Sequence, residues 1–188
     1  MNKKLLFKLI EKCEMADCQV RGIVCDMGNK VLLKELGVNL RQMKYFFSNP
    51  IQESRSVYIF PDMPHCMKNL RNHTLDHGMV IKYSDKPDIS LSKEHFQQLI
   101  SCDGTDFKLC HKITDSHLDV RGVERQRVRP AMELFSDSVS QSFRQIFGSY
   151  ADGQAQVIGI IDSWVDVMNS KFKFEFGKDK RCGLGKML

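Results

Sequence analysis

The chain has 188 residues, 42% of them hydrophobic, which is enough to bury a core and excludes a disordered tail. Twenty-eight Lys and Arg against 23 Asp and Glu give a net charge of +5, a mild basic excess that suits a nucleic-acid partner without identifying one. The longest apolar run near the start, residues 5–7, is far too short to span a membrane, so we expect no membrane partner. Seven cysteines without a Cys-x-x-Cys pair predict reduced thiols and argue against a zinc knuckle.

The first part of the chain has the pattern of a layered α/β domain. Helical spacing of leucines predicts an amphipathic helix over residues 4–16, and residues 19–26 form a β-branched run that ends on Asp26. A return helix is expected over 29–36, a second strand over 55–60, and a third helix over 65–77 that stops at Gly78. Helix, strand, helix, strand, helix is half of such a domain.

The character of the sequence changes after Asp88. Helical spacing recurs over residues 92–101, 131–147 and 154–169, with no convincing strand between them. We therefore expect an α/β part over residues 1–82, an α-helical domain over 83–175, and a basic tail over 176–188. From residue 171 onward, six basic residues stand against two acidic ones, so much of the net charge lies at this end.

Two motifs in the first part carry candidate chemistry. Asp26, at the end of a buried strand, could hold a divalent metal, although an aspartate in this position also caps helices for ordinary reasons. Asp62 and a helix with Lys68, Arg71 and Asn72 at helical spacing follow the next strand, which suits contacts to a phosphate backbone. The alternative for this helix is an ordinary solvated face.

Read together, these strings resemble the P-element family of transposases, to which the THAP-domain transposases belong. Residues 20–29 (VRGIVCDMGN) resemble that family's strand with the second catalytic aspartate, and residues 61–72 (PDMPHCMKNLRN) resemble its Asp-x-x-His-x-x-Lys-x-x-Arg-Asn signature. Residues 109–118, 124–131, 135–139 and 164–170 resemble, in the family's order, the helical guanine-nucleotide-binding insertion. The resemblance covers nearly the whole chain.

The resemblance implies a partial ribonuclease H-like core followed by a mainly α-helical GTP-binding insertion domain. It gives Asp26 a catalytic and metal-binding role and implies DNA contacts for Lys68 and Arg71. The implied nucleotide-binding positions are Asp106, Lys112, Arg127, Val128, Ser136, Asp166 and Asn169. Arg127 stands where the family has lysine, and Val165 stands where it has an aromatic residue.

The implied function is GTP-dependent DNA transposition by the complete protein, with Mg²⁺ and GTP as cofactors and transposon-end DNA as partner. The family's first catalytic aspartate and final glutamate have no counterpart here, so we expect this chain alone to be inactive. A homo-oligomer or a full-length transposase is a further expected partner, and the expected location is the nucleus. The alternative is a non-catalytic guanine-nucleotide- or DNA-binding module, either repressor-like or a domesticated remnant.

Overall fold

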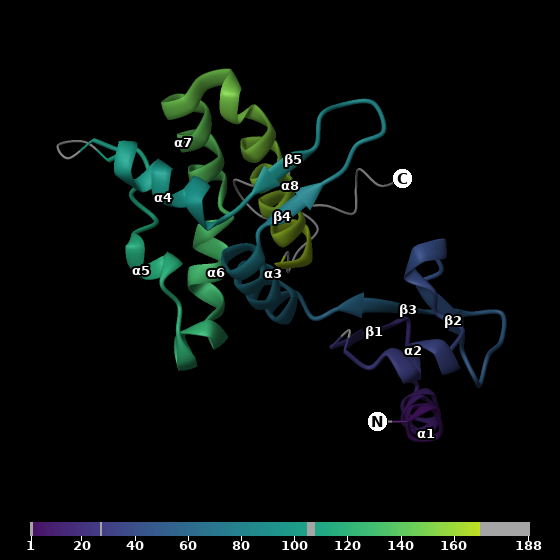
Figure 1. Cartoon of the computed structure of the whole chain (residues 1–188). Helices are drawn as coiled ribbons and strands as arrows, with labels where there is room; N and C mark the ends of the chain where they lie inside the picture. The colour runs from purple at the N-terminus through teal and green to yellow at the C-terminus, as the bar shows by residue number, and fades with distance from the viewer. Residues whose placement is uncertain (1, 27, 105–107, 170–188) are drawn as a thin grey trace. The chain divides into compact units, whose positions relative to one another are not determined.

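The computed structural model of the chain describes residues 2–26, 28–104 and 108–169. Its contacts divide the chain into two compact units, residues 1–62 and 63–188, and each is described by itself (Figure 1). The expected boundary between residues 82 and 83 lies inside a β-hairpin of the second unit, so the compact units divide earlier in the chain than the expected domains.

Unit 1 is built on a three-stranded sheet. Its elements are α1 (Lys3–Met15), β1 (Gly22–Cys25), α2 (Lys30–Glu35), the 3₁₀ turn η1 (Leu40–Gln42), β2 (Phe46–Ser48) and β3 (Ser56–Pro61). The central strand β3 runs parallel to β1 and antiparallel to β2. The short strand β2 was not expected from the sequence, because three residues give too little alternation to reveal a strand.

The core of unit 1 lies between the helices and the sheet. Leu6 and Ile10 of α1 pack with the buried leucines of α2 and with Val57 and Ile59 of β3. Unit 1 also contains a largely buried ion pair, in which Arg55 Nη2 lies 2.9 Å from Glu14 Oε2. These contacts connect residues more than 40 positions apart, so α1 is part of the folded unit.

Unit 2 is mainly helical. Its elements are α3 (Met63–His77), β4 (Met79–Ile81), β5 (Ile89–Leu91), α4 (Lys93–Cys102), α5 (Asp115–Leu118), η2 (Gly122–Gln126), α6 (Val128–Leu134), α7 (Asp137–Phe147), η3 (Gly148–Ala151) and α8 (Asp152–Asn169). The β4–β5 hairpin, which precedes the first of the expected helices of this part, was not expected from the sequence. Glycine at position 78 allows the φ of +74° with which α3 ends.

The helix expected over residues 131–147 is in fact two helices. Ser136 has an extended backbone, and its hydroxyl donates to the carbonyl of Glu133, so α6 ends and α7 begins at this point. The sequence hides this break because both helices bury their apolar faces in one core, which keeps the hydrophobic spacing nearly continuous.

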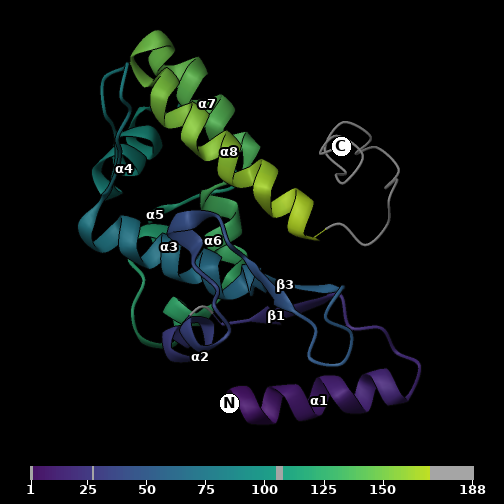
Figure 2. The same cartoon turned by 90° about the vertical axis from the view of Figure 1, so that its right-hand side faces the viewer.

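The centre of that core is an aromatic cluster. Phe96 of α4 is fully buried and meets the rings of Phe135 and Phe143 edge to face. Helices α7 and α8 lie side by side (Figure 2), and Ser140 Oγ donates to the carbonyl of Ala155 across their contact at 2.7 Å. Among the described residues, no helix has the length and apolar character needed to cross a membrane.

Candidate functional site

A cavity of about 390 Å³ in unit 2 brings together three of the expected nucleotide-binding residues. These are Lys112, which precedes α5, Ser136 at the start of α7, and Asp166 on α8. The other residues that line this cavity are Arg129, Met132, Glu133, Phe135, Asp162 and Val165. We call this space the Lys112 cavity.

Regular secondary structure determines which side chains reach the Lys112 cavity. On α8, Asp162, Val165 and Asp166 lie three and four residues apart and therefore on one face of the helix. Val165 is buried and Asp166 is half-buried, so the carboxylate lies beside an apolar wall. On the opposite element, the turn at Ser136 ends α6 and places that residue at the cavity wall.

Glu133 gives the Lys112 cavity an ordered charged edge. Its carboxylate accepts from Arg129 Nε at 2.8 Å and lies 3.1 Å from His117 Nε2. Burial raises the pKa of Glu133, but hydrogen bonds from Arg129 and His117 outweigh burial and leave this pKa below its usual value. The backbone N–H of Thr114 donates to His117 Nδ1, so the proton of the neutral ring lies on Nε2 and is donated to Glu133.

A second cavity of about 690 Å³ contains Arg127. Asp115, Ser116, His117, Asp119, Glu124 and Pro130 line it as well. We call it the Arg127 cavity. Because His117 lines this cavity and Glu133 lines the Lys112 cavity, the hydrogen bond between the two residues joins the walls of both.

The remaining expected nucleotide-binding residues do not line the Lys112 cavity where the structure describes them. Arg127 is exposed, and its Nε lies 3.2 Å from Glu124 Oε2. Val128 opens α6, and Asn169 is exposed at the end of α8, but neither lines the two cavities. Asp106 lies outside the described residues. The structure therefore gathers Lys112, Ser136 and Asp166 in one cavity and places Arg127 in another.

Arg71, for which a DNA contact was expected, is not at the surface of unit 2. Arg71 has no exposed area and donates to the backbone carbonyls of Glu124, Arg125 and Arg127. Lys68 is half-buried, and its Nζ lies 3.5 Å from Gln126 Oε1. The sequence shows Arg71 on a polar helix face, but the segment that covers it lies more than fifty residues later.

Asp26 lies at the carboxyl end of β1, as expected. Cys25 is paired with Pro61, so Asp26 and Asp62 follow neighbouring parallel strands, and the backbone N–H of Gly28 donates to Asp26 Oδ1 at 2.9 Å. Within the described ranges, no group of three or more His, Cys, Asp or Glu side chains is arranged to hold a metal ion. These residues do not fit a two-ion Mg²⁺ site, which takes about three converging carboxylates.

Sequence reasoning missed several residues of the Lys112 cavity, above all Glu133 and Arg129. Their spacing of four residues on a helix was a usable signal for an ion pair. It was obscured because Glu133 was placed inside a single long helix that began at residue 131, whereas it lies in the last turn of α6, which begins at Val128.

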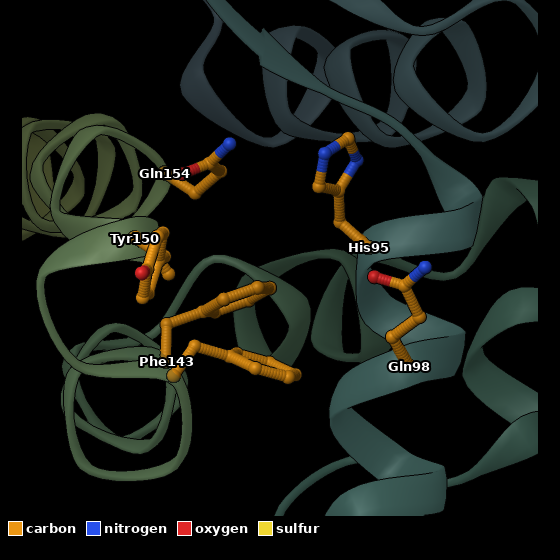
Figure 3. A pocket seen from close by; sticks show the side chains of 7 residues that line it. His95, Gln98, Phe143, Tyr150 and Gln154 are labelled. Carbon is orange, nitrogen blue, oxygen red and sulfur yellow. The ribbon is translucent and has the colours of Figure 1, made fainter.

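A cavity of about 200 Å³ between α4 and the α7–α8 turn was also not expected. Tyr150 and Gln154 lie on one side of it and His95 and Gln98 of α4 on the other, with Phe143 between them (Figure 3). Phe147 also lines it. Its other lining residue is Ala151. With no Lys or Arg among these residues, this cavity does not suit a polyphosphate.

Comparisons with known proteins agree with the arrangement of unit 2. Residues 64–181 match the family model of the TNP-like, GTP-binding insertion domain. The "Transposable element P transposase" of Drosophila melanogaster is 30% identical over 179 residues, which are 91% of this chain and 23% of that protein. The chain thus spans about a quarter of the length of this relative.

A solved structure extends the match to the fold. The chain is similar to a chain of the "Drosophila P element transposase strand transfer complex", with a TM-score of 0.80 and 30% sequence identity. The match covers 92% of this chain and 39% of that chain. The matched family model spans well over half of the sequence, and the chain therefore belongs to the family of proteins with a TNP-like, GTP-binding insertion domain, a family related to the P element transposase.

Proposed function

We propose that this chain is a guanine-nucleotide-binding part of a P-element-like transposase and that the Lys112 cavity receives GTP. The single observation that carries this proposal is the meeting of Lys112, Ser136 and Asp166 in one cavity. These residues come from separate elements, so only the fold brings them together. Asp106 and Asn169 remain further candidate contacts of the same nucleotide.

The chemistry of these side chains suits a guanine nucleotide. A carboxylate accepts from the N1–H and the amino group of guanine, whereas adenine presents a bare N1 acceptor at the same edge. Asp166 is half-buried beside Val165, where competition from water is reduced. Lys112 and Arg129 supply cations for phosphate oxygens at the same cavity, and Ser136 supplies a hydroxyl.

The proposal extends to the complete protein, of which this chain is a part. Unit 1 supplies part of a ribonuclease H-like core, and the complete protein carries out GTP-dependent DNA cleavage and strand transfer with Mg²⁺ in the nucleus. The similarity to a chain of a strand transfer complex supports the link to DNA. A non-catalytic guanine-nucleotide- or DNA-binding module is the second candidate, because the nucleotide-binding residues of the Lys112 cavity all lie within unit 2.

Calorimetric titration of the full chain with GTP and ATP tests the nucleotide site. A buried hydrogen-bonding mismatch costs about 1–3 kcal/mol, so GTP should bind roughly 5- to 150-fold more tightly than ATP. Lys112→Gln should weaken GTP binding, while Lys86→Gln in the β4–β5 loop serves as a matched control and should leave the affinity unchanged. Equal affinities for ATP and GTP in the unmodified chain would contradict the proposal.

A further inference from the structure

One face of α3 holds the segment that leads to Arg127. Lys68, Arg71, Asn72 and Asp76 lie at helical spacing on α3, and each contacts residues 124–127. Contacts between α3, η2 and α6 are part of the same packing, and α3 lies beside α6 in Figures 1 and 2. This face of α3, which resembles the family signature, therefore packs against another segment of unit 2.

Arg71 makes the central contacts of this face. Its guanidinium donates to the carbonyls of Arg125 at 2.8 Å, Glu124 at 3.1 Å and Arg127 at 3.2 Å. A guanidinium has several donors in a fixed planar geometry, so one side chain can hold three carbonyls in a defined arrangement. An ammonium group at this position has no such planar fork.

The held segment needs such support. Residues 122–126 form a 3₁₀ turn, whose hydrogen bonds have poorer geometry than those of an α-helix. Arg125 is fixed a second time, because its guanidinium is hydrogen-bonded to the carboxylate of Asp76. Arg127 then ends the segment in an extended conformation, with its side chain at the Arg127 cavity.

We infer that α3 is a positioning element of the nucleotide site, in which buried Arg71 fixes the 124–127 backbone so that Arg127, whose cavity adjoins the Lys112 cavity at the His117–Glu133 hydrogen bond, reaches the phosphates of the bound nucleotide. This inference rests on the proposed function, because it takes GTP as the ligand. Arg71 itself contacts no ligand. It acts through Arg127, so its substitution affects the phosphate end of the nucleotide and not the base.

The test compares GTP with guanosine, which has the same base and no phosphates. Arg71→Lys keeps the charge but loses the planar fork. Asp76→Asn weakens the ion pair that holds Arg125, a residue of the same segment, at the surface of the unit. Each substitution should weaken GTP binding roughly fivefold, the equivalent of one net hydrogen bond of about 1 kcal/mol, and leave guanosine binding unchanged. Asp152→Asn, in the exposed Arg144–Asp152 pair, is the matched control and should change neither affinity.

A double-mutant cycle separates positioning from simple destabilisation. In an Arg127→Ala background, Asp76→Asn and Arg71→Lys should have no further effect on GTP affinity, because the side chain they position is gone. Equal losses for GTP and guanosine, or undiminished effects in the Arg127→Ala background, would overturn the inference while GTP binding by the unmodified chain still stands. Failure of the unmodified chain to bind GTP would remove the proposed function and this inference together. If Arg71→Lys does not fold, Asp76→Asn decides alone.

Discussion

The sheet edge of unit 1 and the Lys112 cavity of unit 2 differ in how many of their expected residues meet. At the sheet edge, Asp26 and Asp62 follow neighbouring strands, but the described residues bring no third ligand to them. In unit 2, three expected residues from three parts of the sequence line one cavity. A nucleotide site inside one compact unit can work by itself, whereas a two-ion site depends on every carboxylate that builds it.

The largest effect should come from the aromatic core of unit 2. Phe96→Ala removes a fully buried ring that contacts Phe135 and Phe143, which should cost about 3–5 kcal/mol of unfolding free energy and abolish GTP binding. Val57→Ala, in the core of unit 1, is the control and should leave GTP affinity unchanged. Denaturant unfolding and calorimetry measure both, and loss of GTP binding in Val57→Ala would show that the site depends on unit 1.

The basic end of the sequence should govern DNA binding. Residues 171–188 lie outside the described part, and their positive charge predicts weak, salt-sensitive binding. Changing Lys171, Lys173, Lys178 and Lys180 to Gln should reduce the log–log salt slope by about 0.9 for each DNA phosphate that the chain then fails to neutralise. Filter binding at several salt concentrations gives the slope. An unchanged slope would show that these lysines do not bind DNA.

A smaller loss of stability is expected in unit 1 when the pH is lowered. The backbone N–H of Val20 and the side chains of Asn49 and Arg55 donate to Glu14, and together they hold the pKa of Glu14 below its usual value despite burial. The unfolded chain therefore takes up this proton at a higher pH than the folded chain. Stability from Glu14 is present at neutral pH and lost as the pH falls below the usual carboxyl value of about 4.3.

Glu14→Gln tests this pH dependence. The variant should be less stable than the unmodified chain at pH 7, and the difference should shrink toward pH 3, which thermal unfolding at a series of pH values can follow. Glu11→Gln on the exposed face of α1 is the control. A constant difference at every pH would contradict the assignment to Glu14.

The smallest effect on nucleotide binding should come from Asp26. Asp26→Asn is expected to leave GTP affinity within twofold, and the unmodified chain alone is expected to show no strand transfer with Mg²⁺ or Mn²⁺, because the described residues bring no third ligand to Asp26. Strand-transfer assays on labelled DNA measure the activity. Metal-dependent activity that disappears in Asp26→Asn would show that unit 1 is a working catalytic site.

Local patterns in the sequence were sufficient for much of the fold. The leucine spacing of α1, the β-branched runs of β1 and β3, and Gly78 at the end of α3 predicted these elements within a few residues. Strands of three residues, such as β2 and β5, were missed because they pair through contacts that local spacing does not encode. The division after Asp62 likewise depends on packing between distant segments.

The candidate site was predictable in part. Lys112, Ser136 and Asp166 came from a family resemblance, and the structure places them together. The burial of Arg71 was not predictable from its own helix, because the carbonyls that it binds belong to a segment more than fifty residues away. Glu133 was missed for a related reason, since its importance arises from His117 and Arg129 together.

The central claim is that the Lys112 cavity selects guanine. The base preference of Asp166→Asn tests this claim most directly. The substitution replaces an acceptor with a donor, so the full chain should lose affinity for GTP and gain affinity for xanthosine triphosphate, whose base has an oxygen in place of the amino group. Asp162→Asn, one turn away on the same wall, is the matched control and should not change the base preference. Calorimetry should show this reversal only in Asp166→Asn, and an unchanged preference for GTP in that variant would contradict the assignment of Asp166.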